Sequence, residues 1–206
     1  VGFTIPDRAE QELLAVEREM SGGTLLAARL ALASRGIAVN VGGGFHHAHR
    51  DRGGGFCIFN DVAVAIRAQR AAGFGGRILV VDLDLHDGDG TRSIFADDPT
   101  VHTYSVHNQN WNDRPAIEAT VLPLGPGVDD ARYLETLAAT LPPLFERFRP
   151  ALVVYLCGAD PAADDALGDW QVSAAGLLER DRMVTGLARR RHLPLVVTLA
   201  GGYGDN

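Results

Sequence analysis

Lysine is absent from the chain, because all 19 of its basic residues are arginine. The phosphate-binding loop G-x-x-x-x-G-K-[ST] therefore cannot occur, and any mechanism that needs a lysine side chain is excluded. We attribute the bias to GC-rich coding and expect a bacterial source.

Cysteine is scarce and long apolar runs are missing. The two cysteines, Cys57 and Cys157, are too few for a disulfide framework. The apolar runs are short, and none approaches the roughly 20 residues that a membrane span needs. No basic, then apolar, then small-residue signal opens the chain. We therefore expect a cytoplasmic protein without a membrane partner.

Negative charge exceeds positive charge. The net charge is -7 and the pI is about 5.4, which argues against a surface that neutralises phosphates. The basic run at residues 189–191 falls where a helix is expected to end, and cations are favourable there. Nucleic acid is therefore not an expected partner.

Short apolar segments alternate with helical patterns along the chain, as in an α/β fold. Expected helices cover residues 8–20, 24–36, 62–73, 129–149 and 173–191. Expected strands cover residues 37–41, 77–84, 101–107, 151–157 and 193–200. Ser21-Gly22-Gly23 is expected to separate the first two helices, and Asn60 or Asp61 to cap the third. The length of 206 residues and the hydrophobic content of 46% predict one domain, residues 1–206. The Val, Leu and Ile content of the strands predicts a mostly parallel sheet covered by helices on both faces.

The stretch "VVDLDLHDGDG", residues 80–90, runs from an apolar strand into a turn with several acidic residues. Asp84 and His86 are two apart on extended chain, so both side chains project to one side, as two ligands of one metal must. A carboxylate and an imidazole suit Zn²⁺, which needs a third protein ligand, and the acidic loop at Asp164-Asp165 is the best source. A solvated acidic turn is the simplest alternative. A calcium loop does not fit, because its glycine and distal glutamate would stand where the chain has Asp87 and Ser93.

Adjacent histidines, His46 and His47, lie in a glycine-rich loop after the first strand. Imidazole titrates near neutral pH and can accept a proton from activated water, while a buried carboxylate behind it fixes its tautomer. Asp82 and Asp89 are suitable carboxylates. Asp87 remains without a role.

Five ordered motifs together resemble the zinc-dependent histone deacetylase family, within the arginase-deacetylase superfamily: "GGGFHHA", "GGGFCIFND", "VVDLDLHDGDGT", "CGAD…DDALG" and "LAGGY". The resemblance covers nearly the whole chain. The segments "GGTLLAARLAL", "DRGGGF" and "S..GLLERD" favour the class IV branch and its bacterial relatives.

The resemblance implies a role for each matching residue. The zinc ligands would be Asp84, His86 and Asp165. The general base and acid, or an electrostatic partner, would be His46 and His47, supported by Asp82 and Asp89, and Tyr203 would polarise the substrate carbonyl. Gly55, Phe56 and Val172 would line the tunnel for the acyl-lysine stem, although Val172 could equally be a core residue. Asp82 and Ser105 would belong to a structural potassium site.

The implied reaction is hydrolysis of an N-acyl amine to a free amine and a carboxylate. Substrates implied by the family are acetyl-lysine or long-chain acyl-lysine on proteins, acetylated polyamines and other small amides. Two further functions stay open: a non-catalytic zinc-binding module that holds acylated ligands or a partner protein, and a ureohydrolase with two Mn²⁺ ions. Both are disfavoured, the first by the histidine pair and Tyr203, the second by too few ligands for a second metal.

Three departures from the family pattern stand out. Asp87 stands where many family members have a histidine or a glutamine. An extra anion there could strengthen metal binding or raise the pKa values of the histidines, but we expect its side chain to point into solvent without effect. Trp111, in "NQNWNDRPA", either replaces the aromatic wall of the tunnel or covers the core. The chain is also shorter at both ends than family members, which puts its substrate specificity in doubt.

Overall fold

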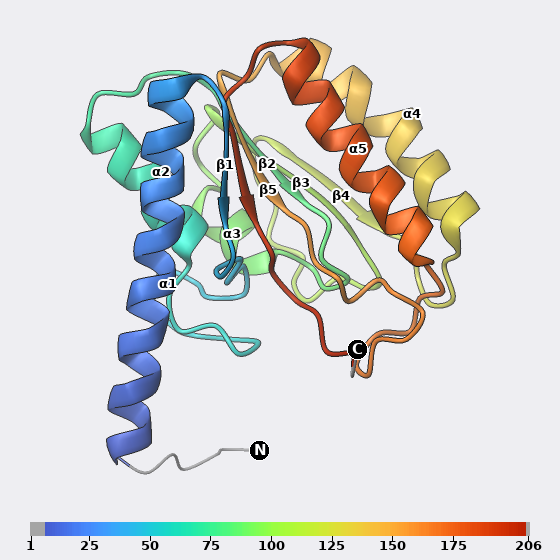
Figure 1. Ribbon diagram of the computed structural model, residues 1–206, viewed down its shortest axis with the longest axis horizontal. Helices are drawn as coiled ribbons and strands as arrows, with labels where there is room; N and C mark the ends of the chain where they lie inside the picture. Colours follow the sequence, from blue (N-terminus) through green and yellow to red (C-terminus); the bar gives the residue numbers. More distant parts are fainter. Residues whose placement is uncertain (1–6, 205–206) are drawn as a thin grey trace.

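The computed structural model describes residues 7–204, which form an α/β fold with a six-stranded sheet (Figure 1). The helices are α1 (Asp7–Ser34), α2 (Asp61–Ala71), α3 (Asp89–Ile94), α4 (Asp130–Phe148) and α5 (Ala174–Arg190). The strands are β1 (Ile37–Asn40), β2 (Ile78–Asp82), β3 (Val101–His107), β4 (Ala119–Pro123), β5 (Leu152–Leu156) and β6 (Leu195–Thr198). The predicted fold class is confirmed. None of the helices in this part of the chain combines the length and apolar character that a membrane span requires.

All neighbouring strands pair in parallel, in the order β1-β6-β5-β2-β3-β4. From β2 the chain continues outward through β3 and β4, and then returns to place β5 on the other side of β2. The strand order therefore reverses between β2 and β5. Ligands of parallel sheets gather beyond the carboxyl ends of the strands at such a reversal.

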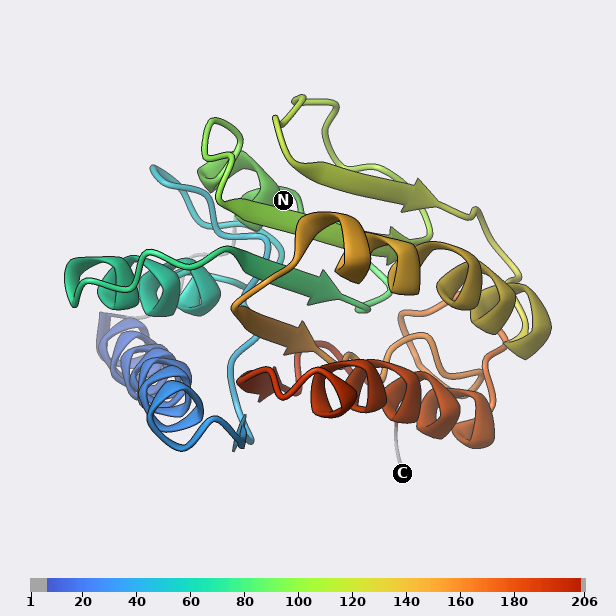
Figure 2. The ribbon, with the colours of Figure 1, turned by 90° about the horizontal axis from the view of Figure 1, so that it is seen from above.

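Two apolar cores cover the two faces of the sheet. Helices α1 and α2 pack on one face and α4 and α5 on the other (Figures 1 and 2). The interior strands β2, β3, β5 and β6 are buried along their whole length. The sequences of β2, β5 and β6 are apolar almost throughout, as expected for a parallel sheet covered by helices, whereas β3 also buries polar residues such as His102 and Ser105.

Side-chain caps begin three of the helices close to the predicted residues. Asn60 accepts the N–H of Ala63 at 2.9 Å and starts α2, so Asn60 rather than Asp61 is the cap. Asp129 starts α4, and Ser173 starts α5 in the same way. Each cap satisfies a backbone donor that has no partner within its helix.

Three elements differ from the prediction. Helix α1 continues through Ser21-Gly22-Gly23 instead of ending there. A Cβ at Gly23 would lie 2.6 Å from the Asn40 side chain, so this glycine permits close packing of the end of β1 against the helix. Helix α3 and strand β4 were not expected: α3 has only six residues, and β4 is a short, partly exposed edge strand of five residues.

Candidate active site

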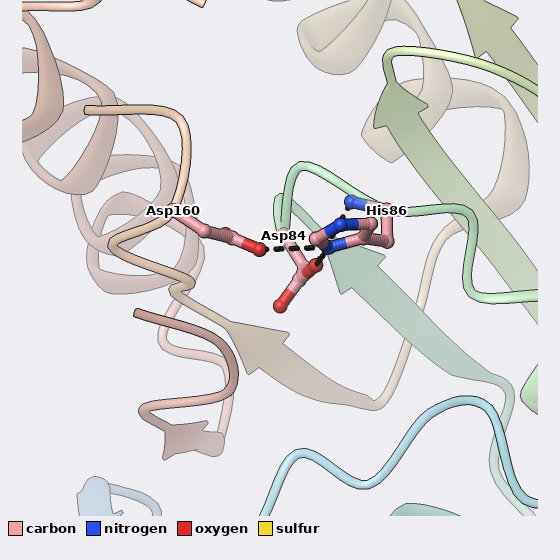
Figure 3. Close-up of side chains that lie close together, drawn as sticks. All are labelled: Asp84, His86 and Asp160. Carbon is pink, nitrogen blue, oxygen red and sulfur yellow. Dashed lines mark hydrogen bonds and ion pairs between the residues drawn. The ribbon is translucent and has the colours of Figure 1, made fainter. Parts of the chain in front are cut away.

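Three potential metal ligands meet at the strand reversal, Asp84 and His86 after β2 and Asp160 after β5 (Figure 3). Their ligand atoms all lie within 4.8 Å of one another. The Nδ1 atom of His86 lies 3.1 Å from Asp84 Oδ1 and 2.9 Å from Asp160 Oδ2. Both carboxylates are buried. The predicted positions of Asp84 and His86 side by side are therefore found.

The structure differs from the prediction at the third residue, because Asp160 and not Asp165 joins the cluster. Asp165 uses its carboxylate to hold its own loop instead: Oδ1 accepts the N–H groups of Leu167 and Gly168 at 2.9 and 2.8 Å. Oδ2 accepts the N–H of Tyr203 at 2.6 Å. Asp165 is therefore an anchor for Tyr203, and its oxygens are already occupied by backbone donors.

The cluster has the donors and the space that a divalent cation needs. A Cβ at Gly201 would lie 2.6 Å from both Asp84 Oδ2 and Asp160 Oδ2, so the glycine leaves open the point that these two oxygens face. Carboxylate oxygens and imidazole nitrogens both bind zinc, and a catalytic zinc site has three protein ligands and keeps a further position for water or substrate. The residues present therefore fit such an ion.

The two adjacent histidines each have a carboxylate behind the ring. His46 Nδ1 lies 2.8 Å from Asp82 Oδ2, and His47 Nδ1 lies 3.0 Å from Asp89 Oδ1. All four side chains are buried. A carboxylate at Nδ1 keeps the proton on that nitrogen and leaves Nε2 free to exchange protons. The sequence identifies both carboxylates as suitable partners, and the family resemblance implies these two pairings, Asp82 with His46 and Asp89 with His47.

The surroundings of the two histidines shift their pKa values in opposite directions. Burial disfavours the charged form of His46, but Asp82 and Asp84 outweigh it and raise its pKa to about 10. For His47, burial and the neighbouring His46 lower the pKa below its ordinary value, despite the hydrogen bond to Asp89.

The pKa values of Asp84 and Asp160 are also shifted in opposite directions. Burial and the adjacent Asp84 raise the pKa of Asp160 to about 7. Burial also opposes ionisation of Asp84, but the charge of His46 and the hydrogen bond from His86 hold its pKa below the usual range. Two carboxylates this close do not readily ionise together, because their negative charges repel each other, unless a nearby cation offsets that repulsion.

A cavity of about 120 Å³ opens beside these groups, and its walls include His46, His47, Gly55, Phe56 and Tyr203. The Tyr203 and Phe56 ring centroids are 6.2 Å apart. Phe56 is 81% exposed and holds a left-handed backbone angle, φ +63°. A large exposed aromatic at the mouth of a cavity suits contact with an apolar ligand chain.

Two predicted residues lie away from this cavity. Val172 is fully buried in the apolar core under α4 and α5, so it is a core residue and does not line a tunnel. Ser105 is paired with Asp82 in the β2–β3 register, and its hydroxyl is 2.8 Å from His107 Nδ1. A potassium site at Asp82 and Ser105 stays a prediction.

Asp87 and Trp111 have definite places that the sequence did not reveal. Asp87 is fully buried and forms an ion pair with Arg92, so the expectation that it faces solvent is wrong. Trp111 stacks on the ring of His47, with ring centroids 3.9 Å apart and an interplanar angle of 9°. Of the two alternatives, the structure therefore favours a wall of the site over a cover for the core.

Several supporting residues were not predicted from the sequence. Asp61 is buried and accepts the N–H groups of Gly44 and Phe45, which fixes the loop in front of the histidine pair. Glu17, on α1, is buried and accepts two N–H groups at residues 58–59. Asp61 follows a helix cap and could have been suspected, whereas nothing in the sequence links Glu17 to a loop this far along the chain.

Comparison with known proteins agrees with this arrangement. The chain matches the histone deacetylase domain over residues 7–206. It is 43% identical over 186 residues to an uncharacterized protein of Picosynechococcus sp. (strain ATCC 27264 / PCC 7002 / PR-6), covering 90% of this chain and 62% of that protein. It is 36% identical over 199 residues to histone deacetylase 2 of Arabidopsis thaliana, covering 94% of this chain and 51% of that protein.

A third relative is histone deacetylase B of Dictyostelium discoideum, 32% identical over 197 residues, with 89% of this chain and 45% of that protein covered. The chain thus spans about half the length of these curated relatives. Its own domain match extends over nearly all of its residues. The ligand cluster, the carboxylate-backed histidines and the matched domain together show that the chain belongs to the histone deacetylase family.

Proposed function

We propose that the chain is a zinc-dependent deacylase, which hydrolyses the amide bond between an acyl group and a lysine side chain or another primary amine. One observation carries the proposal: Asp84, His86 and Asp160 come within 4.8 Å of one another next to two buried histidines that carboxylates hold in place. A binding module would need the cluster but not the histidine pair. Amide hydrolysis uses both.

Asp84, His86 and Asp160 would hold the zinc ion. When bound, the ion supplies Lewis-acid polarisation of the amide carbonyl and makes water acidic enough to act near neutral pH. The carboxylates of Asp84 and Asp160 offset its charge, and the hydrogen bond from Gly201 N–H to Asp84 Oδ2, 2.8 Å long, keeps one of them in place.

His46 and His47 would move the protons of the reaction. Asp82 and Asp89 hold the Nδ1 atoms, so each ring presents Nε2 to its surroundings. One imidazole would take the proton of the attacking water, and an imidazolium would return a proton to the leaving amine nitrogen. Tyr203, in the cavity wall, would donate a hydrogen bond to the carbonyl oxygen as negative charge develops on it.

The acyl chain and the amine stem would reach these groups past Phe56 and Gly55. We expect the substrate to be acylated lysine in a peptide or protein. Small acylated amines such as acetylated polyamines are the alternative substrate class for the same site. We also propose a cytoplasmic location, which the two free cysteines support. A structural potassium ion at Asp82 and Ser105 completes the proposal.

The test is amide hydrolysis on fluorogenic acetyl-, trifluoroacetyl- and myristoyl-lysine peptides and on acetylated polyamines, with zinc measured on the same sample. We expect one zinc per chain and turnover that a hydroxamate chelator abolishes. The pattern across the panel gives the preferred acyl group and amine.

A matched pair of histidine variants makes this test specific. His46→Ala should lose most turnover and keep zinc, whereas His192→Asn, at an exposed turn away from the site, should change neither. Stoichiometric zinc without turnover on any substrate would contradict the enzyme and favour a module that holds acylated ligands. Two Mn²⁺ per chain would favour ureohydrolase chemistry instead.

A further inference from the structure

A buried ion pair lies directly behind the proposed site. Asp87 follows the metal-binding turn, and Arg92 belongs to α3, five positions later. The exposed fractions are 0% for Asp87 and 4% for Arg92. Arg92 donates from both terminal nitrogens to the two carboxylate oxygens, and the Nη2–Oδ2 distance is 2.8 Å. Such two-point pairs fix geometry as well as charge.

The pair also holds the irregular segment at residues 110–112. Asp87 Oδ2 accepts the N–H of Trp111 at 3.1 Å, and Arg92 Nη2 donates to the carbonyl of Asn112 at 2.9 Å. The Asn112 side chain donates to Asp89 Oδ2 at 2.9 Å. The backbone is therefore fastened on both sides of the Trp111 side chain, and one of these bonds reaches the carboxylate that holds His47.

The indole of Trp111 in turn holds the ring of His47. The two rings are nearly parallel, with centroids 3.9 Å apart. Gly55 also packs closely on this side chain, because a Cβ at Gly55 would come within 2.2 Å of His47 Cδ2. Trp111 also meets the edge of the His86 ring, at 5.7 Å between centroids. Trp111 itself is 44% exposed, so burial alone does not fix it in this position.

We propose that Trp111 is a positioning residue for His47 and that the Asp87–Arg92 pair holds Trp111 in place. The inference rests on the proposed function only where it assigns proton transfer to His47. With Asp89 fixing Nδ1 and Trp111 and Gly55 confining the ring, the direction of Nε2 is set before substrate binds. Proton transfer depends on such orientation, and small displacements slow it strongly.

The first experiment follows Trp111 without using activity. The chain has two tryptophans, and the other, Trp170, is 1% exposed in the core under α4 and α5. ¹⁹F NMR of the whole chain labelled with 5-fluorotryptophan therefore gives two resonances, which Trp111→Phe assigns. In Asp87→Asn/Arg92→Gln, we expect the Trp111 resonance to move toward that of free 5-fluorotryptophan while the Trp170 resonance stays.

Two further variants serve as a control and as a replacement for the double variant. Asp51→Asn breaks an exposed acid–arginine pair, Asp51–Arg52 at 3.4 Å, and should leave both resonances unchanged. If the double variant fails to fold, the Trp170 resonance moves as well. Arg92→Lys then replaces it, because a lysine keeps the charge but not the planar set of donors that also reaches Asn112.

The second experiment measures hydrolysis in the zinc-loaded enzyme. Trp111→Ala and the double variant should each lower kcat roughly tenfold or more while KM changes less than about twofold, because ring orientation and not substrate affinity is lost. Trp111→Phe keeps a flat aromatic ring over His47 and should restore most of kcat.

The outcomes separate the two proposals. An unmoved Trp111 resonance in a folded variant without the ion pair would overturn the holding role of Asp87 and Arg92. A displaced Trp111 with unchanged kcat, or a loss that appears only in KM, would overturn its role in positioning His47. Absence of hydrolysis in the unaltered chain would contradict the proposed function instead, and the NMR result would still decide what holds Trp111.

Discussion

Replacing Asp160 and Asp165 one at a time by asparagine distinguishes a metal ligand from a loop anchor. Asp160 lies 2.9 Å from His86 Nδ1 within the ligand cluster. Loss of a hydrogen-bond partner behind a metal ligand alone typically weakens metal binding about 10- to 100-fold, and loss of a ligand should weaken it more. We therefore expect Asp160→Asn to lose zinc during dialysis under conditions in which the unaltered chain retains it.

Asp165→Asn should have a different effect. The amide can still accept the N–H groups of Leu167 and Gly168, but its NH₂ group replaces the oxygen that accepts the Tyr203 N–H at 2.6 Å. A hydrogen bond to a charged group contributes about 1.5–3 kcal/mol. We expect a lower melting temperature and reduced turnover because Tyr203 is less well held, with zinc content unchanged.

Zinc content by mass spectrometry, thermal melting and hydrolysis of an acetyl-lysine peptide measure these effects together. Asp164→Asn, at an exposed neighbour in the same loop, is the control and should behave like the unaltered chain. Loss of zinc from Asp165→Asn, with retention in Asp160→Asn, would refute the assignment of the third ligand. The melting experiment shows whether each variant is folded, so loss of zinc through unfolding is distinguished from loss of a ligand.

Four other measurements test the site and its surroundings. Tyr203→Phe should keep zinc and lower kcat about 10²- to 10³-fold, as loss of one oxyanion donor does; full activity would contradict its role. His46→Ala and His47→Ala should each reduce turnover about 10²-fold or more without loss of zinc, and loss of zinc would reveal a misassigned ligand. Burial raises the pKa of the Cys57 thiol from 9.0 to about 12, so its alkylation at pH 8, followed by peptide mapping, should be roughly 10³-fold slower than in urea. Because the pKa of Cys57 is higher in the folded than in the unfolded chain, the contribution of this thiol to the free energy of unfolding is fully present below pH 9.0. That contribution is lost as the pH rises through about 12. Arg180→Met should destabilise the fold by about 2 kcal/mol or more in urea unfolding, because the buried guanidinium donates to two backbone carbonyls near Asp84 and each carbonyl left without a donor costs about 1–3 kcal/mol. A change below about 1 kcal/mol would show that water replaces the guanidinium.

Local sequence patterns predicted the fold because the sheet is buried on both faces. Nearly continuous Val, Leu and Ile segments identify β2, β5 and β6, and β3 has Val, Thr and Tyr residues that are common in strands. The residues of all four strands are buried. Polar caps at Asn60, Asp129 and Ser173 mark helix starts in the same local way. The edge strand β4 lacks this signal, since its residues are partly exposed and its stability comes from pairing with β3.

The site was predictable where its residues share one strand end. Asp84 and His86 project together because they are two apart, and the histidine pair is adjacent in the chain. The third residue of the cluster, Asp160, depends instead on the path of the loop after β5. The β2–β5 register pairs Asp82 with Leu156, so the residues that follow Leu156 run beside Asp84 and bring Asp160 to it before the loop turns away. Composition alone could not choose between the two aspartates.

The role of Asp87 was hidden for a related reason. Its partner Arg92 lies on α3, and the pair becomes visible only when that short helix is known. An acidic residue on a glycine-rich turn more often faces water, which makes solvent exposure the natural expectation. The buried pair and the segment it holds are properties of three-dimensional packing.

The concentration of aspartate around the site follows from the number of donors that must be fixed there. Each of these aspartates accepts at least one hydrogen bond from an imidazole, a guanidinium or a backbone N–H group, and Asp84 and Asp160 share His86. The pairs are Asp82 with His46, Asp89 with His47, Asp84 and Asp160 with His86, Asp87 with Arg92, Asp165 with the Tyr203 N–H, and Asp61 with the Gly44 and Phe45 N–H groups. Carboxylates form stronger hydrogen bonds than neutral acceptors. In such a site the histidines, Tyr203 and the Asp84–His86–Asp160 cluster are held in place by the fold itself, which is the preorganisation that the proposed hydrolysis would require.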